Sequence, residues 1–303
     1  MRHSFVLSSY KQLGDTVLQE PALSARANLD GHPVGWMGKA GFLPLIDLMG
    51  GRVVRISKPG PWIHADRVVC SEPGSRAGFR AFCIRSRRKE VLCQPHEPSG
   101  SWHHWGGMER RVFPHDGWYR AEWLFRAVVD ETGHGFRPPQ LEPPPETWRP
   151  AGFTRRDYVL LHVSSGWPGK CWPSSHWVEW IRRLGIPGRD MVVTAGPQAW
   201  EQQRAEEVRA GIPGTTAPGV MDLRGFLAVI ASAREVWTVD GAASHLSSAL
   251  GRRVMTLFSR YADPSHWHYS TPRSLCVDYK GDSMEGLTVD SVESAWRSWS
   301  ASL

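Results

Sequence analysis

Cysteine and long apolar runs are scarce in this chain of 303 residues. The five cysteines are an odd number with no CxxC pair, so we expect neither a disulfide framework nor a zinc site, and a reduced, cytoplasmic protein fits. No apolar run approaches 18 residues, so no transmembrane helix is expected. The N-terminal stretch MRHSFVLSSYKQLGD is too weakly apolar for a signal peptide and predicts a first strand.

Charge is unevenly distributed. The chain has a net charge of +6, of which +5 falls in residues 1–150 and +1 in residues 151–303. The basic residues of one cluster are Arg76, Arg80, Arg85, Arg87, Arg88 and Lys89. Such a cluster is more often a solvated face than a binding site for an anionic partner. Since no recognition motif accompanies it, we expect no nucleic-acid partner and at most peripheral contact with a membrane.

A proline-rich segment divides the chain. Residues 137–153 contain six prolines, which favour an extended linker, so we predict domains at 1–145 and 146–285. After it, apolar runs at 158–165 and 191–197 alternate with helical patterns at 198–210 and 226–233, as in a doubly wound α/β domain.

The first half begins in the same way. A strand at 5–10 precedes a helical pattern over 16–29, and the less regular residues 60–135 are interpreted as insertions in a second Rossmann-like domain. Two helices are also predicted: one near residue 177, capped by Ser174 or Ser175, and a terminal one over 286–303. The terminal helix places Trp296 and Trp299 on a broad apolar stripe that must dock on protein.

Residues 235–258 indicate a phosphate site. An apolar run stops at Asp240, small residues follow, and a helical pattern begins near His245. In open α/β sheets, ligands bind beyond the carboxyl ends of the strands. A helix N-terminus there offers free N–H groups, so the segment predicts a nucleotide or another phosphorylated ligand.

Three turns carry a family resemblance. These are LGD (13–15), HVSSGWPGKCWP (162–173) and VDGAASHLSSAL (239–250), in this order and followed by LFSRYADPSHW. Together they resemble glycosyltransferase family 9, the ADP-heptose:lipopolysaccharide heptosyltransferases. The resemblance covers about residues 1–30 and 155–303. It implies a GT-B fold of two facing Rossmann-like domains whose C-terminal helix crosses back to the N-terminal domain.

The first turn ends in Asp15, which the resemblance makes the general base. A sugar hydroxyl is a poor nucleophile, so a nearby carboxylate must take its proton as the new bond forms. The alternative is that Asp15 only caps a helix.

In the second turn, the resemblance assigns Ser164, Ser165 and Lys170 to the donor diphosphate. Hydroxyls and an ammonium at a strand end can bind the phosphates and offset charge on the leaving group, which gives Lys170 a catalytic role as well. Alternatively, the segment is a loop with an exposed lysine.

The third turn departs from the family pattern. The family has Asp, Thr or Ser, Gly, two residues and His, whereas this chain has Asp240, Gly241, Ala242 and then His245. Gly241 therefore keeps a backbone N–H for phosphate but lacks a hydroxyl, and Ala242 adds a methyl group where the ligand approaches. His245 is expected to face the diphosphate or to support Asp240.

The acidic residue that the family uses for ribose has no clear equivalent. The corresponding stretch offers Gly196, Gln198 and Glu201 for the ribose or base. Two histidine pairs are not expected to bind a metal: adjacent His103 and His104, between Trp102 and Trp105, and His266 with His268, around Trp267. We expect neither metal nor cofactor.

The resemblance thus implies an inverting, metal-independent glycosyltransferase. It would move a heptose or similar sugar from an ADP-sugar to a saccharide hydroxyl. Two alternatives stay open. The acceptor could be a small soluble molecule such as an aminocyclitol antibiotic precursor, or the chain could be a non-catalytic nucleotide-sugar-binding protein.

Overall fold

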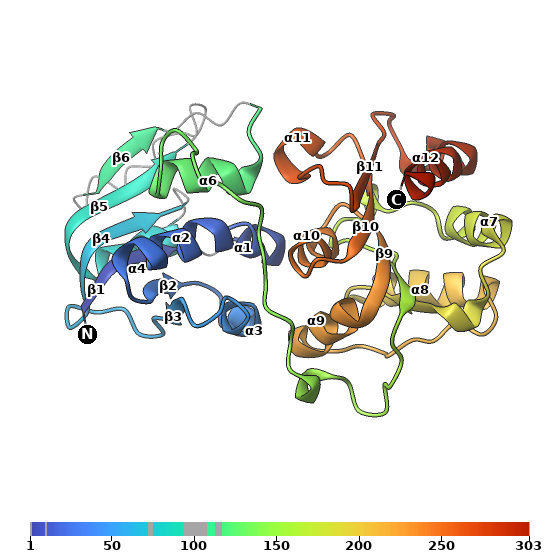
Figure 1. Cartoon of the computed structure of the whole chain (residues 1–303), viewed down its shortest axis with the longest axis horizontal. Helices are drawn as coiled ribbons and strands as arrows, with labels where there is room; N and C mark the ends of the chain where they lie inside the picture. Colours follow the sequence, from blue (N-terminus) through green and yellow to red (C-terminus); the bar gives the residue numbers. More distant parts are fainter. Residues whose placement is uncertain (1, 10, 72–74, 94–107, 113–116, 303) are drawn as a thin grey trace. The chain divides into compact units, whose positions relative to one another are not determined.

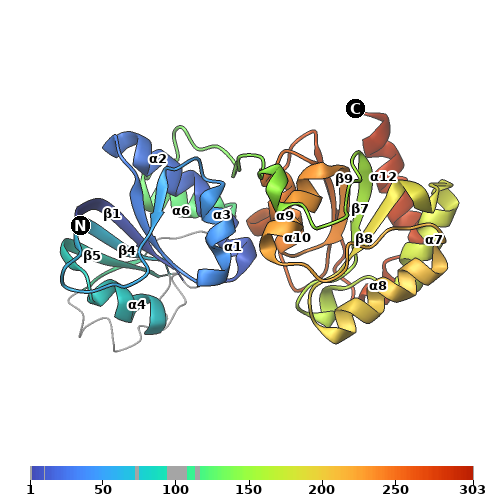
Figure 2. The same ribbon diagram turned by 90° about the horizontal axis from the view of Figure 1, so that it is seen from below.

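The computed structural model describes residues 2–9, 11–71, 75–93, 108–112 and 117–302. Contacts divide the chain into two compact units, Met1–Glu142 and Pro143–Leu303 (Figures 1 and 2). The sequence places the boundary three residues later, after residue 145. Each unit contains a parallel sheet with helices, and the two are described in turn.

The N-terminal domain is built on a parallel sheet in the order β3-β2-β1-β4-β5-β6. Its strands are β1 (Arg2–Ser8), β2 (Val34–Met37), β3 (Val53–Arg55), β4 (His64–Cys70), β5 (Arg85–Cys93) and β6 (Glu109–Val112). Its helices are α1 (Leu13–Val17), α2 (Glu20–Asp30), α3 (Leu43–Asp47), α4 (Ser75–Phe82) and α6 (Arg120–Val128), with a 3-10 turn at Ala40–Phe42. The central strand β1 is buried from Phe5 to Ser8, so the residues that follow it start from a fixed position.

The helix predicted over residues 16–29 is interrupted. In the structure α1 ends at Val17 and α2 begins at Glu20, with Pro21 in its first turn. Proline lacks the N–H that a continuous helix would need and is favoured at a helix start, so the chain restarts there. Asp15 consequently lies in a separate short helix directly after β1.

The start of the proline-rich segment is bound to the N-terminal domain. Glu20 is fully buried, and Arg137 donates to both of its carboxylate oxygens at 2.7 and 2.8 Å. The backbone N–H of Gln140 adds a third hydrogen bond at 2.9 Å. This part of the segment is therefore anchored, although its composition indicates a free linker.

The C-terminal domain has a parallel sheet in the order β11-β10-β9-β7-β8. Its strands are β7 (Tyr158–His162), β8 (Met191–Thr194), β9 (Ala233–Val239), β10 (Arg253–Phe258) and β11 (Ser274–Asp278). Its helices are α7 (Ser174–Leu184), α8 (Ala199–Gly211), α9 (Leu223–Ser232), α10 (Ala242–Ala249), α11 (Pro264–Trp267) and α12 (Val289–Ala301). Pro173 occupies the N-cap of α7, with no side-chain cap, so the prediction of a Ser174 or Ser175 cap is wrong. The proline fixes the extended geometry that the cap position needs.

A cluster of buried tryptophans fills one side of this sheet. Trp172, Trp177, Trp180 and Trp237 are fully buried, and neighbouring ring centroids lie 4.4 to 6.4 Å apart. Because indoles bury large apolar areas, this cluster contributes strongly to the stability of the domain.

The terminal helix α12 packs on α7 and β11 of its own domain (Figure 1). Trp296 joins the tryptophan cluster and donates to Glu235 Oε1 at 2.9 Å, and Trp299 donates to the Pro272 carbonyl at 3.0 Å. The return of the helix to the N-terminal domain, which the resemblance implies, stays a prediction. Over the described ranges, no helix is both long and apolar enough to cross a membrane.

Candidate functional site

The carboxyl ends of β7 and β9 bring Lys170 and Asp240 together. These strands are neighbours, with His162 opposite Thr238, so the loop after each starts at the same edge of the sheet. Lys170 Nζ donates to Asp240 Oδ2 at 2.5 Å, and the two side chains are 21% and 5% exposed. The carboxylate is thus buried while the ammonium still reaches solvent. This geometry suits a cation held ready for an anionic ligand.

The N-terminus of α10 begins beside this pair. Gly241 is its N-cap and provides no side-chain cap, so no side chain occupies the first-turn N–H groups from that position. The backbone at Gly241 is extended, with φ 169° and ψ −169°, a conformation open to any residue. A Cβ added there would lie 3.4 Å from Ser165 Cβ, at the edge of ordinary contact. Ser165 and Gly241 are therefore neighbours, as expected for one phosphate site.

Ser164 and Glu201 are bound to each other. The Ser164 hydroxyl donates to Glu201 Oε1 at 2.9 Å and accepts from the Gly196 backbone N–H at 2.9 Å. Glu201 is 2% exposed, and its other oxygen accepts from the Gln198 N–H at 3.1 Å. A Cβ at Gly196 would meet Glu201 Oε1 at 2.2 Å, so a side chain there would displace the Glu201 carboxylate. This network fixes the ends of β7 and β8, while Gln198 is exposed and its amide oxygen accepts from Trp200 Nε1 at 2.9 Å.

Two histidines interact near the donor-side loops: His245 lies within α10, and His268 follows α11. His245 is 8% exposed, and its ring centroid lies 6.2 Å from that of Trp267. Burial, together with nearby His245, lowers the pKa of His268 to about 4, so His268 is neutral at pH 7. Among the residues that the structure describes, no group of three or more His, Cys, Asp or Glu side chains could hold a metal ion. The pair His103 and His104, with Trp102 and Trp105, lies outside the described residues.

Asp15 lines a small cavity of the N-terminal domain. It is the third residue of α1, and Gln12 at the N-cap donates its backbone N–H to Asp15 Oδ2 at 3.3 Å. Lys11, Ser71 and Arg120 line the same cavity. Ser71 is 7% exposed, and its hydroxyl has no hydrogen-bond partner in the described chain. A buried hydroxyl without a partner is uncommon, so it marks a position where a ligand group could bind.

Sequence reasoning missed Ser71. The only available signal was its place directly after the apolar end of β4, at the same sheet edge as the end of β1. The basic cluster predicted over residues 76–89 is partly paired. Arg88 contacts Glu90 at 2.8 Å, and Arg87 lies 4.0 Å from Asp66.

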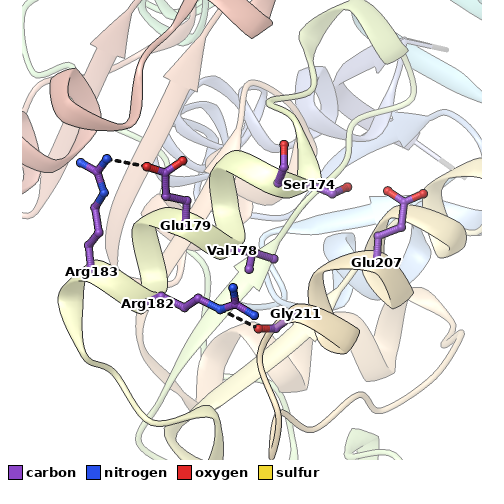
Figure 3. Close-up of a pocket in the computed structure, with 8 residues that line it drawn as sticks. Ser174, Val178, Glu179, Arg182, Arg183, Glu207 and Gly211 are labelled. Atoms are coloured by element: carbon purple, nitrogen blue, oxygen red, sulfur yellow. Dashed lines mark hydrogen bonds and ion pairs between the residues drawn. The ribbon is translucent and has the colours of Figure 1, made fainter.

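A separate hollow lies between α7 and α8 (Figure 3). Its lining includes Val178, Arg182 and Arg183, and it contains none of the predicted site residues. Arg183 pairs with Glu179, and Arg182 donates to the Gly211 carbonyl at 3.2 Å (Figure 3). These charges are engaged within the protein, so the hollow adds nothing to the candidate site.

Two α/β domains, each built on a parallel sheet, are the architecture of the GT-B fold class. The structure matches E. coli heptosyltransferase WaaC with ADP at a TM-score of 0.75 and 18% identity, covering 99% of this chain and 100% of that one. It matches E. coli ADP-heptose lps heptosyltransferase II at 0.75 and 14% identity, covering 98% of both chains. These likenesses confirm the predicted fold class.

Residues 138–287 match the family model of glycosyltransferase family 9 (heptosyltransferase). Lipopolysaccharide heptosyltransferase 1 of Escherichia coli O18:K1:H7 is 29% identical over 135 residues, which are 45% of this chain and 40% of that protein. The same enzyme of Pseudomonas aeruginosa is 32% identical over 100 residues, 33% and 28% of the two chains. The matched segments thus span less than half of these relatives. Residues 138–287 are therefore similar to glycosyltransferase family 9, the family that the three turns resemble.

Proposed function

We propose that this chain is an inverting glycosyltransferase that moves a heptose or a similar sugar from an ADP-sugar to an acceptor hydroxyl. The observation that carries the proposal is the Lys170–Asp240 pair beside the N-terminus of α10, within the segment that matches family 9. The related WaaC, whose fold this chain shares, was solved with ADP.

In this proposal the donor diphosphate lies between Lys170 and the start of α10. The Lys170 ammonium and the N–H groups of α10 offset the charge that develops on the leaving diphosphate. Ser165 adds a hydroxyl next to Gly241. Ser164 acts indirectly, because its hydrogen bonds to Glu201 and Gly196 fix the loop that carries Ser165. Asp240 repels a phosphate, so its role is to hold the Lys170 ammonium in place.

Asp15 is proposed as the general base. It takes the proton of the acceptor hydroxyl while that oxygen attacks the anomeric carbon, and the bond from the anomeric carbon to the diphosphate oxygen breaks. Attack from the face opposite the leaving group inverts the anomeric centre. The Gln12 N–H fixes one oxygen of Asp15, and Ser71 in the same cavity can bind a second acceptor hydroxyl.

The acceptor is proposed to be a saccharide, and an aminocyclitol is the alternative. Both present hydroxyl groups to Asp15, and both can meet the protein in the cytoplasm.

The test begins with a thermal-shift screen of ADP, UDP, GDP and dTDP sugars, since a ligand that binds only the native state raises the melting temperature. We expect stabilisation by the ADP-sugar. Transfer assays with a lipopolysaccharide-core saccharide and with an aminocyclitol then separate the two acceptor classes. A protein that binds ADP-heptose yet neither transfers nor hydrolyses it would be the non-catalytic alternative.

A further inference from the structure

Two exposed aromatic rings lie next to the proposed diphosphate site. Trp167 is 49% exposed and Tyr261 is 42% exposed, and their ring centroids lie 4.3 Å apart with planes at 36°. By contrast, the four tryptophans of the cluster in this domain are fully buried. Since leaving large aromatic surface in water is costly, an exposed pair of this kind marks a binding surface.

The pair is built into the loops of the site. Trp167 immediately precedes the 3-10 turn Pro168–Lys170, and the Lys170 backbone N–H donates to the Trp167 carbonyl at 3.1 Å. Tyr261 follows the carboxyl end of β10. A Cβ at Gly169 would lie 2.9 Å from Tyr261 Cε2, so a larger residue there would push the tyrosine ring away. The glycine therefore permits this close approach.

Cations border the pair. Lys170 Nζ lies 6.0 Å from the Trp167 ring centroid, and Arg260 Cζ lies 5.4 Å from the Tyr261 ring centroid. Lys170 is the same ammonium that contacts Asp240. A group that rests on the aromatic pair is therefore attached close to the diphosphate rather than at the far end of the ligand.

The sheet order indicates which end of the donor this is. Lys170 and Asp240 follow β7 and β9, while β8 lies beyond β7 and β10 lies beyond β9. A nucleoside directed toward Gln198, after β8, leaves the sugar on the side of β10, where Tyr261 lies. Aromatic rings stack on the apolar C–H face of a sugar, and Arg260 can donate to its hydroxyls.

We propose that Trp167 and Tyr261 form the stacking surface for the sugar ring of the donor. This inference rests on the proposed function, because it takes the diphosphate to bind at Lys170. It identifies two specificity residues that lie on separate loops, 94 positions apart in the sequence. Replacing either residue with alanine removes its ring and leaves the backbone of its loop in place.

The test compares ADP with ADP-heptose by calorimetry in Trp167→Ala and Tyr261→Ala. We expect each variant to bind ADP-heptose about tenfold more weakly while its ADP affinity stays within about twofold, as for the loss of one stacking partner. Trp167→Phe keeps a flat ring and should retain most of the affinity. Trp62→Ala, at an exposed tryptophan of the N-terminal domain, is the control, and thermal unfolding checks that each variant is folded.

Two results would overturn the inference. Equal losses for ADP and ADP-heptose in both variants would assign the pair to the base, and unchanged ADP-heptose binding would leave the pair without a ligand. Failure of the proposed function looks different, because the wild-type protein itself would then bind neither compound.

Discussion

Removing the Lys170 ammonium is expected to lower stability and nucleotide affinity by separable amounts. In Lys170→Ala the Asp240 carboxylate, 5% exposed, loses its 2.5 Å ion-pair partner. Breaking a buried pair costs about 3–5 kcal/mol, and we expect about 2–3 kcal/mol because water can enter where Lys170 was 21% exposed. Losing a charge-assisted hydrogen bond to phosphate costs about 1.5–3 kcal/mol, so ADP should bind about 10- to 150-fold more weakly.

Asp240→Asn is the matched variant, and it should change ADP affinity in the other direction. It keeps the size of the side chain and removes the charge that opposes the diphosphate, while the partly exposed Lys170 stays hydrated. We therefore expect a smaller loss of stability and ADP affinity equal to or above that of the wild type. Urea unfolding and calorimetry with ADP measure the two quantities. Both variants could instead weaken ADP binding equally and in proportion to their loss of stability. The Lys170–Asp240 pair would then be purely structural, and its role in diphosphate binding would be refuted.

Three other changes test separate parts of the molecule. Asp15→Asn should lower transfer by about 10²–10⁴-fold with ADP affinity unchanged, and near-normal turnover would refute its role as base. Gly241→Thr should fold normally, since its extended backbone and 3.4 Å contact accept a side chain, and it should tighten ADP binding through a new hydrogen bond of about 0.5–1.5 kcal/mol; weaker binding in calorimetry would contradict this. Burial lowers the pKa of His162 to about 4 in the folded chain, so below pH 6.5 only the unfolded chain gains the proton. His162 should therefore lower stability by roughly 2 kcal/mol between pH 6.5 and pH 5. His162→Gln should remove this share of the slope of the urea midpoints, while the share of His268, whose pKa is also lowered to about 4, remains.

The strands that end at the site could be predicted from the sequence because they are short apolar runs followed by small or polar residues. Asp240 and Ser165 stand at such ends, and the structure places both at one edge of the sheet. The strand β5 could not be predicted in this way. Its first half is rich in arginine, and those charges are accommodated by contacts such as Arg88 with Glu90, which only the assembled sheet provides.

The contacts between loops that are distant in the chain could not be predicted from the sequence either. The sequence offers Glu201 for the ribose or base, and its burial against Ser164 depends on where α8 begins relative to β7. Trp167 and Tyr261 become neighbours only because β7 and β10 end on the same side of the sheet. Hydrophobic periodicity predicts which helices and strands form. The contacts between these side chains depend instead on the paths of the loops that connect the elements.

The tryptophan cluster has a spectroscopic consequence. Rings packed edge to face or tilted, with centroids 4.4 to 6.4 Å apart in a rigid core, should contribute strongly to the near-ultraviolet circular dichroism of the chain. That signal reports on tertiary packing in the C-terminal domain, because Trp172, Trp177, Trp180, Trp237 and Trp296 all belong to it. The signal of these five tryptophans can therefore be used to follow the unfolding of this domain in the intact protein without an added label.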